Sequence, residues 1–446
     1  MRPGRFRART WELIPAAWVL FIAASVTAQI PGGRFDRQVQ AYVRNGDFSG
    51  SVLVAKDAHV LFQKSYGMAN YEWNIPNSEN TKFHIASVTK TFTAAAILHL
   101  QQQGKLKLSD PLSKYIPDFL NGERITIEQL LTHTSGLPDF YSLPEYPIKK
   151  YQPVTLLDLI AWIKTKPLEF LPGSKSSYSN TGYGFLAYIV EQASGKPYEE
   201  YVAEEILKPA GMKETGTFRD DTLIAERATG YQPALGDHGL RNARSYDKTI
   251  LTGSASMYST TNDLYLWCRA LQSGKFADLR QAAYGWNARE TRSKHNYVEQ
   301  DGREPGFVSH VSLFPDDQLM VIVLGNLEDA GVNVLAEDLA AIALGENPEM
   351  PARRSTTAAL ARPEQFVGTY EVNPKLLLDI RAEGDALYLR GTGGDYLPLE
   401  PTKNDSFFYR QLYVKVGFRR DKSGHVEALM WNGEYPCKKL SDKPRP

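Results

Sequence analysis

The sequence contains very little cysteine. Only Cys268 and Cys437 occur among 446 residues, and they lie far apart along the chain. Two cysteines do not make a disulfide framework, so the fold does not depend on one. The two residues could pair in an oxidising compartment, but we predict two buried free thiols.

The sequence also lacks an excess of charge of either sign and any cofactor motif. Lysine plus arginine equals aspartate plus glutamate, at 51 each, so nothing indicates the basic face that nucleic-acid binding needs. The eight histidines are scattered, no His-Glu-x-x-His occurs, and there is no glycine-rich phosphate loop. We therefore expect no nucleic-acid partner, no metal and no cofactor.

The apolar run near the N-terminus is too short for a comfortable membrane span. It covers Leu13 to Val26, follows four arginines between residues 2 and 9, and leads into the small residues Val26-Thr27-Ala28. This order is typical of a cleaved signal peptide, which we assign to residues 1–28. We expect a secreted or periplasmic protein without a stable membrane anchor; a retained anchor is the alternative.

The length and the composition indicate more than one globular domain. A chain of 446 residues with 42% hydrophobic and 23% charged residues suggests two or three soluble domains. Apolar runs predict strands at both ends of residues 35–345 and helices between them, which indicates one sheet assembled from both ends and covered by helices. The predicted strands are 51–56, 59–66, 297–300, 308–314 and 319–324, and the predicted helices begin near residues 125, 154, 183 and 254.

The last part of the chain has a different pattern. Residues 346–362 shift to proline, alanine, arginine and threonine, which is typical of a linker. Residues 363–441 then contain short apolar or alternating runs separated by turns, which predict a small all-β barrel or sandwich. The predicted strands are 376–381, 386–390, 407–409, 412–419 and 426–431.

The rest of the chain is organised around the stretch from Phe83 to Leu100. Ser87 and Lys90 stand three residues apart at the start of a long apolar helix, so their side chains share one face. Free backbone N–H groups at a helix start favour a developing oxyanion, which suits a nucleophile. The alternative for Ser87 is an N-cap. A second Ser-x-x-Lys, Ser245 to Lys248, has no apolar helix behind it, and we interpret it as chance.

Two further segments carry candidate polar groups. Tyr178 and Asn180 stand two apart in a loop before a helical run, where both side chains could point into a cleft. The alternative for Tyr178 is a packing residue with a tethered hydroxyl. His133 lies at the end of a short helix, beside the breakers Gly136 and Pro138, and we predict a structural role for it.

Three motifs together resemble a known family. FHIASVTK, LLTHTSGLPDF and PGSKSSYSN occur in this order and are similar to those of the penicillin-recognising serine hydrolases, the branch with class C β-lactamases, D-alanyl-D-alanine carboxypeptidases and related esterases. The likeness covers Phe48 to Asn326. It implies an α+β fold in which helices flank an antiparallel sheet and the active site lies beside a helical subdomain. The C-terminal part is similar to the lipocalin-like β-barrel modules that some members append.

The resemblance assigns roles to the candidate residues. Ser87 would be the acylated nucleophile, Lys90 would take its proton, and Tyr178 would assist as a general acid or base. Asn180 would hydrogen-bond the substrate or Lys90. A serine hydroxyl needs a neighbour that accepts its proton, and a lysine can do so when burial or another cation lowers its pKa. Whether Lys90 or Tyr178 is the base stays open.

The third motif of the family is altered here. Members usually carry Lys or His, any residue, and then Gly, where this chain has Gln300-Asp301-Gly302. Gly302 would keep the close backbone approach, whereas Gln300 can donate a hydrogen bond but carries no charge. A substrate carboxylate would lose a charge-assisted contact, and Arg303 is the candidate to compensate for it.

Three hypotheses follow for the function. The first is an exported serine hydrolase that cleaves an ester, amide or peptide bond in a small-molecule or peptide substrate through an acyl-enzyme on Ser87. The second is a weakly active or inactive penicillin-binding or sensor protein on the same fold, suggested by Gln300. The third makes the C-terminal β-domain a binder of an apolar ligand. The physiological substrate and the oligomeric state stay open.

Overall fold

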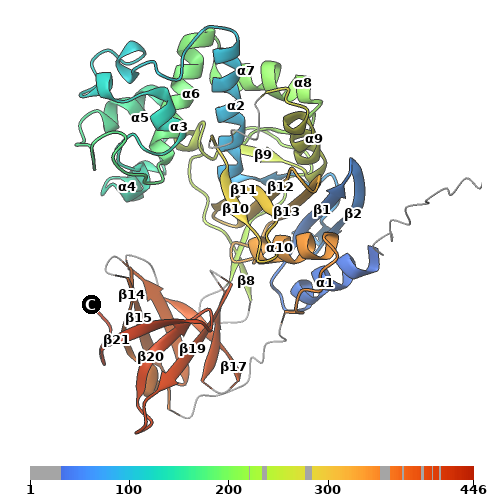
Figure 1. Ribbon diagram of the computed structural model, residues 1–446, viewed down its shortest axis with the longest axis vertical. Helices are drawn as coiled ribbons and strands as arrows, with labels where there is room; N and C mark the ends of the chain where they lie inside the picture. The colour runs from blue at the N-terminus through green and yellow to red at the C-terminus, as the bar shows by residue number, and fades with distance from the viewer. Residues whose placement is uncertain are drawn as a thin grey trace, which may run out of the picture.

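The computed structural model describes nine stretches of the chain. They are residues 32–219, 221–233, 239–276, 284–351, 362–373, 376–392, 396–403, 405–410 and 413–445. The predicted signal peptide, residues 1–28, lies outside them. Within these stretches no helix is both long and apolar enough to cross a bilayer. Figure 1 shows a body of helices and sheet and, after it in the chain, a β-barrel.

A six-stranded antiparallel sheet forms the centre of the first body. Its strand order is β10-β11-β12-β13-β1-β2, so strands from the two ends of the sequence pair at β13 and β1. This confirms the predicted sheet built from both ends. The strands are β1 Gly50–Lys56, β2 His59–Tyr66, β10 Asn287–Glu290, β11 Asn296–Glu304, β12 Phe307–Phe314 and β13 Leu319–Gly325.

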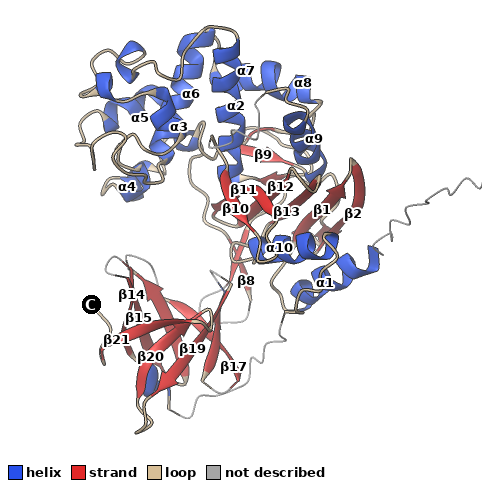
Figure 2. Ribbon diagram, viewed as in Figure 1, coloured by secondary structure: helices blue, strands red, loops and turns tan. Residues whose placement is uncertain are grey.

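Helices cover both faces of this sheet (Figure 2). Alternate side chains of β1 enter two different cores, because successive residues of a strand point to opposite faces. Val52 and Val54 pack with α1 and α10, whereas Leu53 and Ala55 belong to the core that contains α2 and α9. The helices of these two layers are α1 Gly32–Arg44, α10 Val332–Ala343, α2 Thr89–Gln102 and α9 Thr261–Gln272.

Further helices form a subdomain next to α2. The longest is α6, Asn180–Ser194, which packs against α2 and α5. It begins three residues before the predicted start, because the Ser179 side chain accepts a hydrogen bond from the Gly182 amide and caps it. The other helices are α3 Ile127–Leu131, α4 Tyr146–Lys149, α5 Leu156–Ile163, α7 Tyr198–Val202 and α8 Lys208–Ala210.

A short sheet lies beside the entry to α2. Strand β9, Met257–Ser259, pairs with both β5, Phe83–His84, and β6, Gly216–Thr217. The predicted helix from residue 254 therefore starts later, at Thr261, because residues 257–259 pair with these strands. Two small hairpins complete this body: β3 Met68–Asn70 with β4 Ile75–Pro76, and β7 Tyr231–Pro233 with β8 Leu240–Asn242.

The C-terminal strands close into an antiparallel barrel, β14 to β21, which confirms the predicted barrel. Three of its strands, β14, β17 and β21, were not predicted, because prolines and charged side chains interrupt their apolar pattern. The eight strands are β14 Gly368–Asn373, β15 Leu376–Glu383, β16 Ala386–Gly391, β17 Leu397–Lys403, β18 Ser406–Tyr409, β19 Val414–Arg420, β20 Val426–Trp431 and β21 Tyr435–Ser441.

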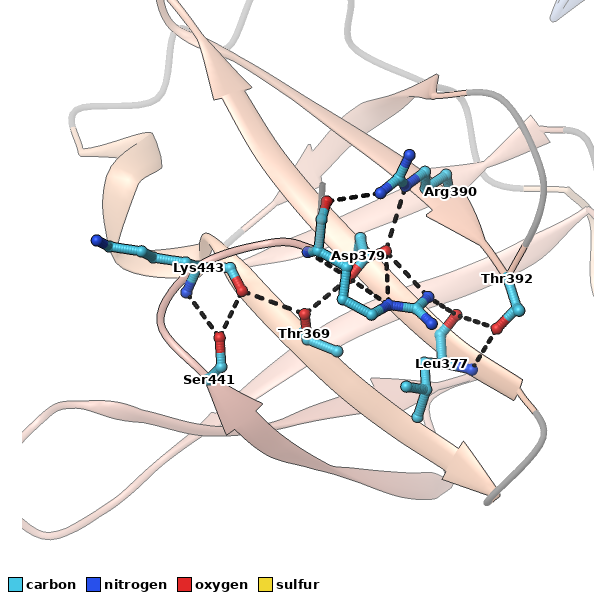
Figure 3. Close-up of polar contacts among 8 residues, drawn as sticks. Thr369, Leu377, Asp379, Arg390, Thr392, Ser441 and Lys443 are labelled. Atoms are coloured by element: carbon cyan, nitrogen blue, oxygen red, sulfur yellow. Dashed lines mark hydrogen bonds and ion pairs between the residues drawn. The ribbon is translucent and has the colours of Figure 1, made fainter.

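A buried carboxylate ties the end of the chain to the barrel (Figure 3). Asp379 on β15 is fully buried and accepts hydrogen bonds from Thr369 Oγ1 at 2.7 Å, Arg390 Nε at 3.2 Å and the Arg445 side chain at 3.1 Å. Arg390 also donates to the backbone carbonyl of Arg445. Two guanidinium groups thus compensate the one buried charge and hold the C-terminal segment in place.

Among the described residues, two side chains that follow β18 contact the first body. Tyr413 stacks on Tyr42 of α1 with ring centroids 5.4 Å apart. Arg410 lies 3.4 Å from Asp47 and 3.4 Å from Asp329, both in the first body. The two cysteines lie in different bodies, Cys268 in α9 and Cys437 in β21, and both are buried free thiols, as predicted.

Candidate active site

The nucleophile candidate lies in a 3-10 turn between strand β5 and helix α2. Ser87 is the middle residue of this turn, Ala86–Val88, and the preceding Ala86 has a positive φ of 45°. Strand β11 passes directly beside the turn at Gly302. A Cβ atom at Gly302 would lie 2.8 Å from the Ser87 backbone nitrogen and 2.4 Å from the Ile85 carbonyl oxygen. This close approach therefore requires glycine at position 302.

The Ser87 hydroxyl meets both predicted partners. Lys90 Nζ lies 3.0 Å from Ser87 Oγ, one helical turn along α2. The Tyr178 hydroxyl, which comes from the loop before α6, lies 2.8 Å from the same oxygen. An amine and a phenol thus converge on one serine from two different elements, at distances that allow direct proton transfer.

Lys90 is buried, with 1% of its surface exposed. Its ammonium nitrogen contacts Asn180 Oδ1 at 2.8 Å and the Ser254 carbonyl oxygen at 2.9 Å. Burial lowers the pKa of Lys90 from 10.5 to about 7, although the carboxylates of Asp139, Glu304 and Asp301 oppose this change. A substantial fraction of Lys90 is therefore neutral near pH 7 and can accept a proton.

Asp139 fixes the orientation of Asn180. Its Oδ2 atom accepts hydrogen bonds from the backbone nitrogen of Asn180 at 3.0 Å and from the side-chain Nδ2 at 2.9 Å. The amide oxygen of Asn180 must then face Lys90, as observed. Sequence reasoning missed Asp139 and the Ser254 carbonyl, although Asp139 stands within the motif LLTHTSGLPDF.

Tyr178 combines a half-exposed ring with a desolvated hydroxyl. Desolvation raises the pKa of its phenol above the ordinary value of 10, while the hydrogen bond with Ser87 lowers it. The ring lies 4.6 Å from the imidazole of His133, centroid to centroid. Tyr178 is thus protonated at neutral pH and can donate a proton.

His133 supports the loop that carries Tyr178. Its Nδ1 atom accepts a hydrogen bond from the Ser179 backbone nitrogen at 3.1 Å. Burial, with the charge of Lys90, lowers the pKa of His133 to about 4, so the imidazole is neutral. These contacts agree with the predicted structural role.

The altered third motif brings no cation to the site. Gln300 is buried, and its Nε2 donates to the Asp301 backbone carbonyl at 3.1 Å, while its Oε1 lies 3.4 Å from Asn287 Nδ2. Arg303 belongs to the other face of β11, by strand alternation, and donates to the Glu328 carbonyl at 3.1 Å. Arg303 therefore does not compensate for the missing charge, contrary to the expectation from sequence.

The described residues include no group of three or more His, Cys, Asp and Glu side chains that could hold a metal ion. The polar groups around Ser87 are instead an amine, a phenol and an amide. This donor set suits proton transfer rather than metal coordination. Lys90 donates hydrogen bonds to Asn180 and Ser254, and its side chain has no oxygen atom that could bind a metal ion.

Comparison with known families divides the chain at the same place as the two bodies. The profile of the Beta-lactamase family matches residues 35–346, and that of a domain of unknown function, DUF3471, matches residues 352–443. The chain is 31% identical over 303 residues to the "Putative penicillin-binding protein PbpX" of Bacillus subtilis strain 168. This alignment covers 66% of this chain and 74% of that protein.

Solved structures share the fold. The crystal structure of a penicillin binding protein from Bacillus halodurans matches with a TM-score of 0.59 and 29% identity, over 69% of this chain and 98% of that one. The octameric penicillin-binding protein homologue from Pyrococcus abyssi matches with a TM-score of 0.63 and 24% identity, over 91% of this chain and 99% of that one. At this identity the second likeness concerns the fold alone.

Proposed function

The chain belongs to the β-lactamase family, and we propose that it is a serine hydrolase that forms an acyl-enzyme on Ser87. One observation carries the proposal: Ser87 Oγ contacts both Lys90 Nζ and the Tyr178 hydroxyl. An N-cap, the alternative for Ser87, is not supported, because no side-chain capping bond occurs at the start of this turn or of α2.

The pKa shifts of Lys90 and Tyr178 favour different roles in proton transfer. Lys90, with a pKa of about 7, takes the proton of Ser87 as Oγ attacks the carbonyl carbon. Tyr178, whose pKa is raised, gives its proton to the leaving oxygen or nitrogen as the scissile bond breaks. The proton held by Lys90 then restores the phenol. The backbone N–H of Ser87, beside Gly302, is placed to stabilise the oxyanion.

Deacylation uses Lys90 as the base a second time. Water attacks the acyl carbon and passes a proton to Lys90, the bond to Ser87 Oγ breaks, and Lys90 returns that proton to the serine oxygen. The substrate would be an ester, an amide or a small peptide. We further propose that residues 1–28 direct export, so that this reaction takes place outside the cytoplasm.

A second candidate is a penicillin-binding or sensor protein that acylates slowly. The position of Gln300 favours it, because its amide is already hydrogen-bonded within the protein and supplies no charge for a substrate carboxylate. Such a protein would show a single-turnover burst at most, whereas a hydrolase turns over continuously.

Covalent labelling tests the assignment of Ser87. The mature protein and its Ser87→Ala variant are incubated with a fluorophosphonate or a labelled penicillin, and adducts are mapped by mass spectrometry. We expect a fluorophosphonate adduct on Ser87, none in the variant, and an unchanged circular dichroism spectrum. An adduct that persists elsewhere in Ser87→Ala would contradict the proposal. Steady-state hydrolysis of p-nitrophenyl acetate separates the hydrolase from the sensor.

A further inference from the structure

A buried carboxylate stands at the end of strand β11, two residues beyond Gly302. Glu304 is 5% exposed, and its side chain lies on the same face of β11 as Gly302, because alternate residues of a strand share a face. Two residues of a strand span about 7 Å, so Glu304 stands close to the point where β11 passes the Ser87 backbone nitrogen. No step of the proposed reaction uses this carboxylate.

Glu304 is held by two phenols and one amine. The Tyr141 hydroxyl donates to Glu304 Oε1 at 2.7 Å, and the Tyr246 hydroxyl donates to Oε2. Lys248 Nζ lies 3.9 Å from the same Oε2 atom. Tyr246 and Lys248 are buried as well. Both oxygens of the carboxylate therefore have hydrogen-bond donors although the side chain is removed from water.

The two tyrosines are anchored in the helical subdomain. Tyr141 lies in the 3-10 turn between α3 and α4, and its ring centroid is 4.6 Å from that of Tyr146 on α4. The segment of Tyr246 is bonded to the stretch between α4 and α5, where the Asp247 amide donates to the Lys150 carbonyl at 2.9 Å. The carboxylate therefore ties a strand of the central sheet to the helical subdomain.

The segment that carries Tyr141 also orients the base. Asp139 caps the turn, since its Oδ1 atom accepts a hydrogen bond from the Tyr141 backbone nitrogen at 3.1 Å. Its Oδ2 atom holds Asn180, whose amide oxygen contacts Lys90 Nζ at 2.8 Å. One short segment is thus bonded to Glu304 on one side and, through Asn180, to Lys90 on the other.

We propose that Glu304 is a positioning residue for the acylation of Ser87, an inference that rests on the proposed function. Strand β11 brings Gly302 against the Ser87 backbone nitrogen, where the oxyanion is stabilised. The segment of Tyr141 holds Asn180 against the base. The tie from Glu304 to Tyr141 keeps these two groups at a fixed separation on either side of the serine hydroxyl.

Stability alone does not account for a buried charge at this place. Removing a carboxylate and an ammonium from water costs free energy that their attraction barely offsets, and apolar side chains of similar volume stabilise comparable folds equally well. Hydrogen bonds have preferred directions that an apolar contact lacks, and a displacement of about 1 Å near reacting groups costs about 100-fold in rate. The expected contribution of Glu304 is therefore a precise position rather than free energy of unfolding.

Two variants break the tie in different ways. The double variant Glu304→Met/Lys248→Met removes both charges and keeps a similar volume. Tyr141→Phe removes a single hydroxyl from an exposed residue, and it decides the test if the double variant does not fold. The matched control is Tyr115→Phe, which breaks a bond of the same kind, to Asp110 Oδ2 at 3.0 Å, next to α3.

Three measurements are made on the mature full-length proteins: fluorophosphonate labelling of Ser87, amide hydrogen exchange of residues 139–142 and 180–182 by mass spectrometry, and thermal melting. In both test variants we expect kinact to fall about tenfold with an unchanged KI. The amides of Tyr141 and Asn180, which bond Asp139, should exchange about tenfold faster. The double variant should melt no lower than the wild type, and Tyr115→Phe should be labelled at the wild-type rate.

The outcomes separate position from stability. Unchanged labelling of Tyr141→Phe, or equal slowing in Tyr115→Phe, overturns the proposal. Slower labelling with unchanged exchange also overturns it, because the effect then does not pass through the segment of Asp139. A wild type that is not labelled at Ser87 refutes the hydrolase itself, whereas the exchange data still decide whether the tie holds this segment, so the two failures are distinguishable.

Discussion

Asp139 is predicted to set the pH range of the reaction. Of the carboxylates that raise the pKa of Lys90 against the effect of burial, Asp139 has the largest effect. The variant Asp139→Asn keeps the shape of the side chain and removes the charge. With less stabilisation of the ammonium, the pKa of Lys90 falls below its value of about 7. The neutral amine, which is the base, then persists at lower pH.

The size of this change follows from the geometry. The Asn180 amide separates the two charges through hydrogen bonds of 2.9 Å to Asp139 and 2.8 Å to Lys90. When the width of the amide is added, the two charges lie about 7 Å apart. Their Coulomb interaction at this distance is about 2 kcal/mol at an effective dielectric constant near 20. Such an energy corresponds to a shift of roughly 1–2 pH units.

The assay is the pH dependence of kcat/KM with p-nitrophenyl acetate. We expect its acid limb, which reports the free enzyme, to lie near pH 7 in the wild type and roughly 1–2 units lower in Asp139→Asn. The plateau also falls, because a neutral amide holds Asn180 less firmly than a carboxylate does. The control is Asp338→Asn, which removes a half-buried carboxylate that accepts hydrogen bonds from Tyr42 and Gln38 on the other face of the sheet.

An acid limb that stays in place, or moves to higher pH, would refute the reasoning. Loss of activity alone would not support it, because a misplaced Asn180 has the same effect at every pH. Only the direction of the shift distinguishes a charge that tunes Lys90 from a side chain that merely supports the loop.

Three further predictions concern other parts of the molecule. Gly302→Ala should lower kcat at least a hundredfold in steady-state assays, because the new methyl would meet the Ile85 carbonyl and the Ser87 nitrogen; near-wild-type turnover would contradict this close approach. Gln300→His should speed acylation by a labelled penicillin about tenfold by restoring a donor that can carry charge, and an unchanged rate would show that another group reads the carboxylate. Asp379→Ala should destabilise the barrel by about 3–5 kcal/mol in thermal melts, because two arginines lose their partner. The pKa of Asp379 is lowered in the fold, so its contribution is full above the unfolded pKa and is lost as pH falls through the folded one; a melting temperature independent of acid pH would contradict this.

Local patterns predicted the parts of the site that one element carries. Ser87 and Lys90 belong to consecutive turns at the start of α2, so their spacing alone placed them on one face. The hairpins of the central sheet were equally local, since turn residues separate their apolar strands. Tyr178 approaches Ser87 only in the tertiary fold, so no local pattern places the two residues together. Only the resemblance to a family linked them in advance.

The remaining features depend on contacts that no local pattern encodes. Asp139 acts through Asn180, 41 residues away, and the Ser254 carbonyl is a backbone atom with no sequence signature. Strand β9 forms because β5 and β6 pair with it. Its own residues carry no strand signal, and the prediction therefore included them in the helix that follows. Arg303 points away from the site because β11 continues to Glu304, beyond the predicted strand 297–300, so that alternation places Arg303 on the face opposite Gln300.

The protonation state of Lys90 depends on two opposing effects that belong to different parts of the fold. Packing of α2 against α6 removes water from the amine and lowers its pKa, whereas carboxylates on the loop between α3 and α4 and on β11 raise it. Burial alone would leave a lysine that is too weakly basic to accept a proton, and the carboxylates alone would keep it charged. A base with a pKa near 7 therefore requires that the helical subdomain and the sheet close on the same amine, which is why these residues form a site only in the folded chain.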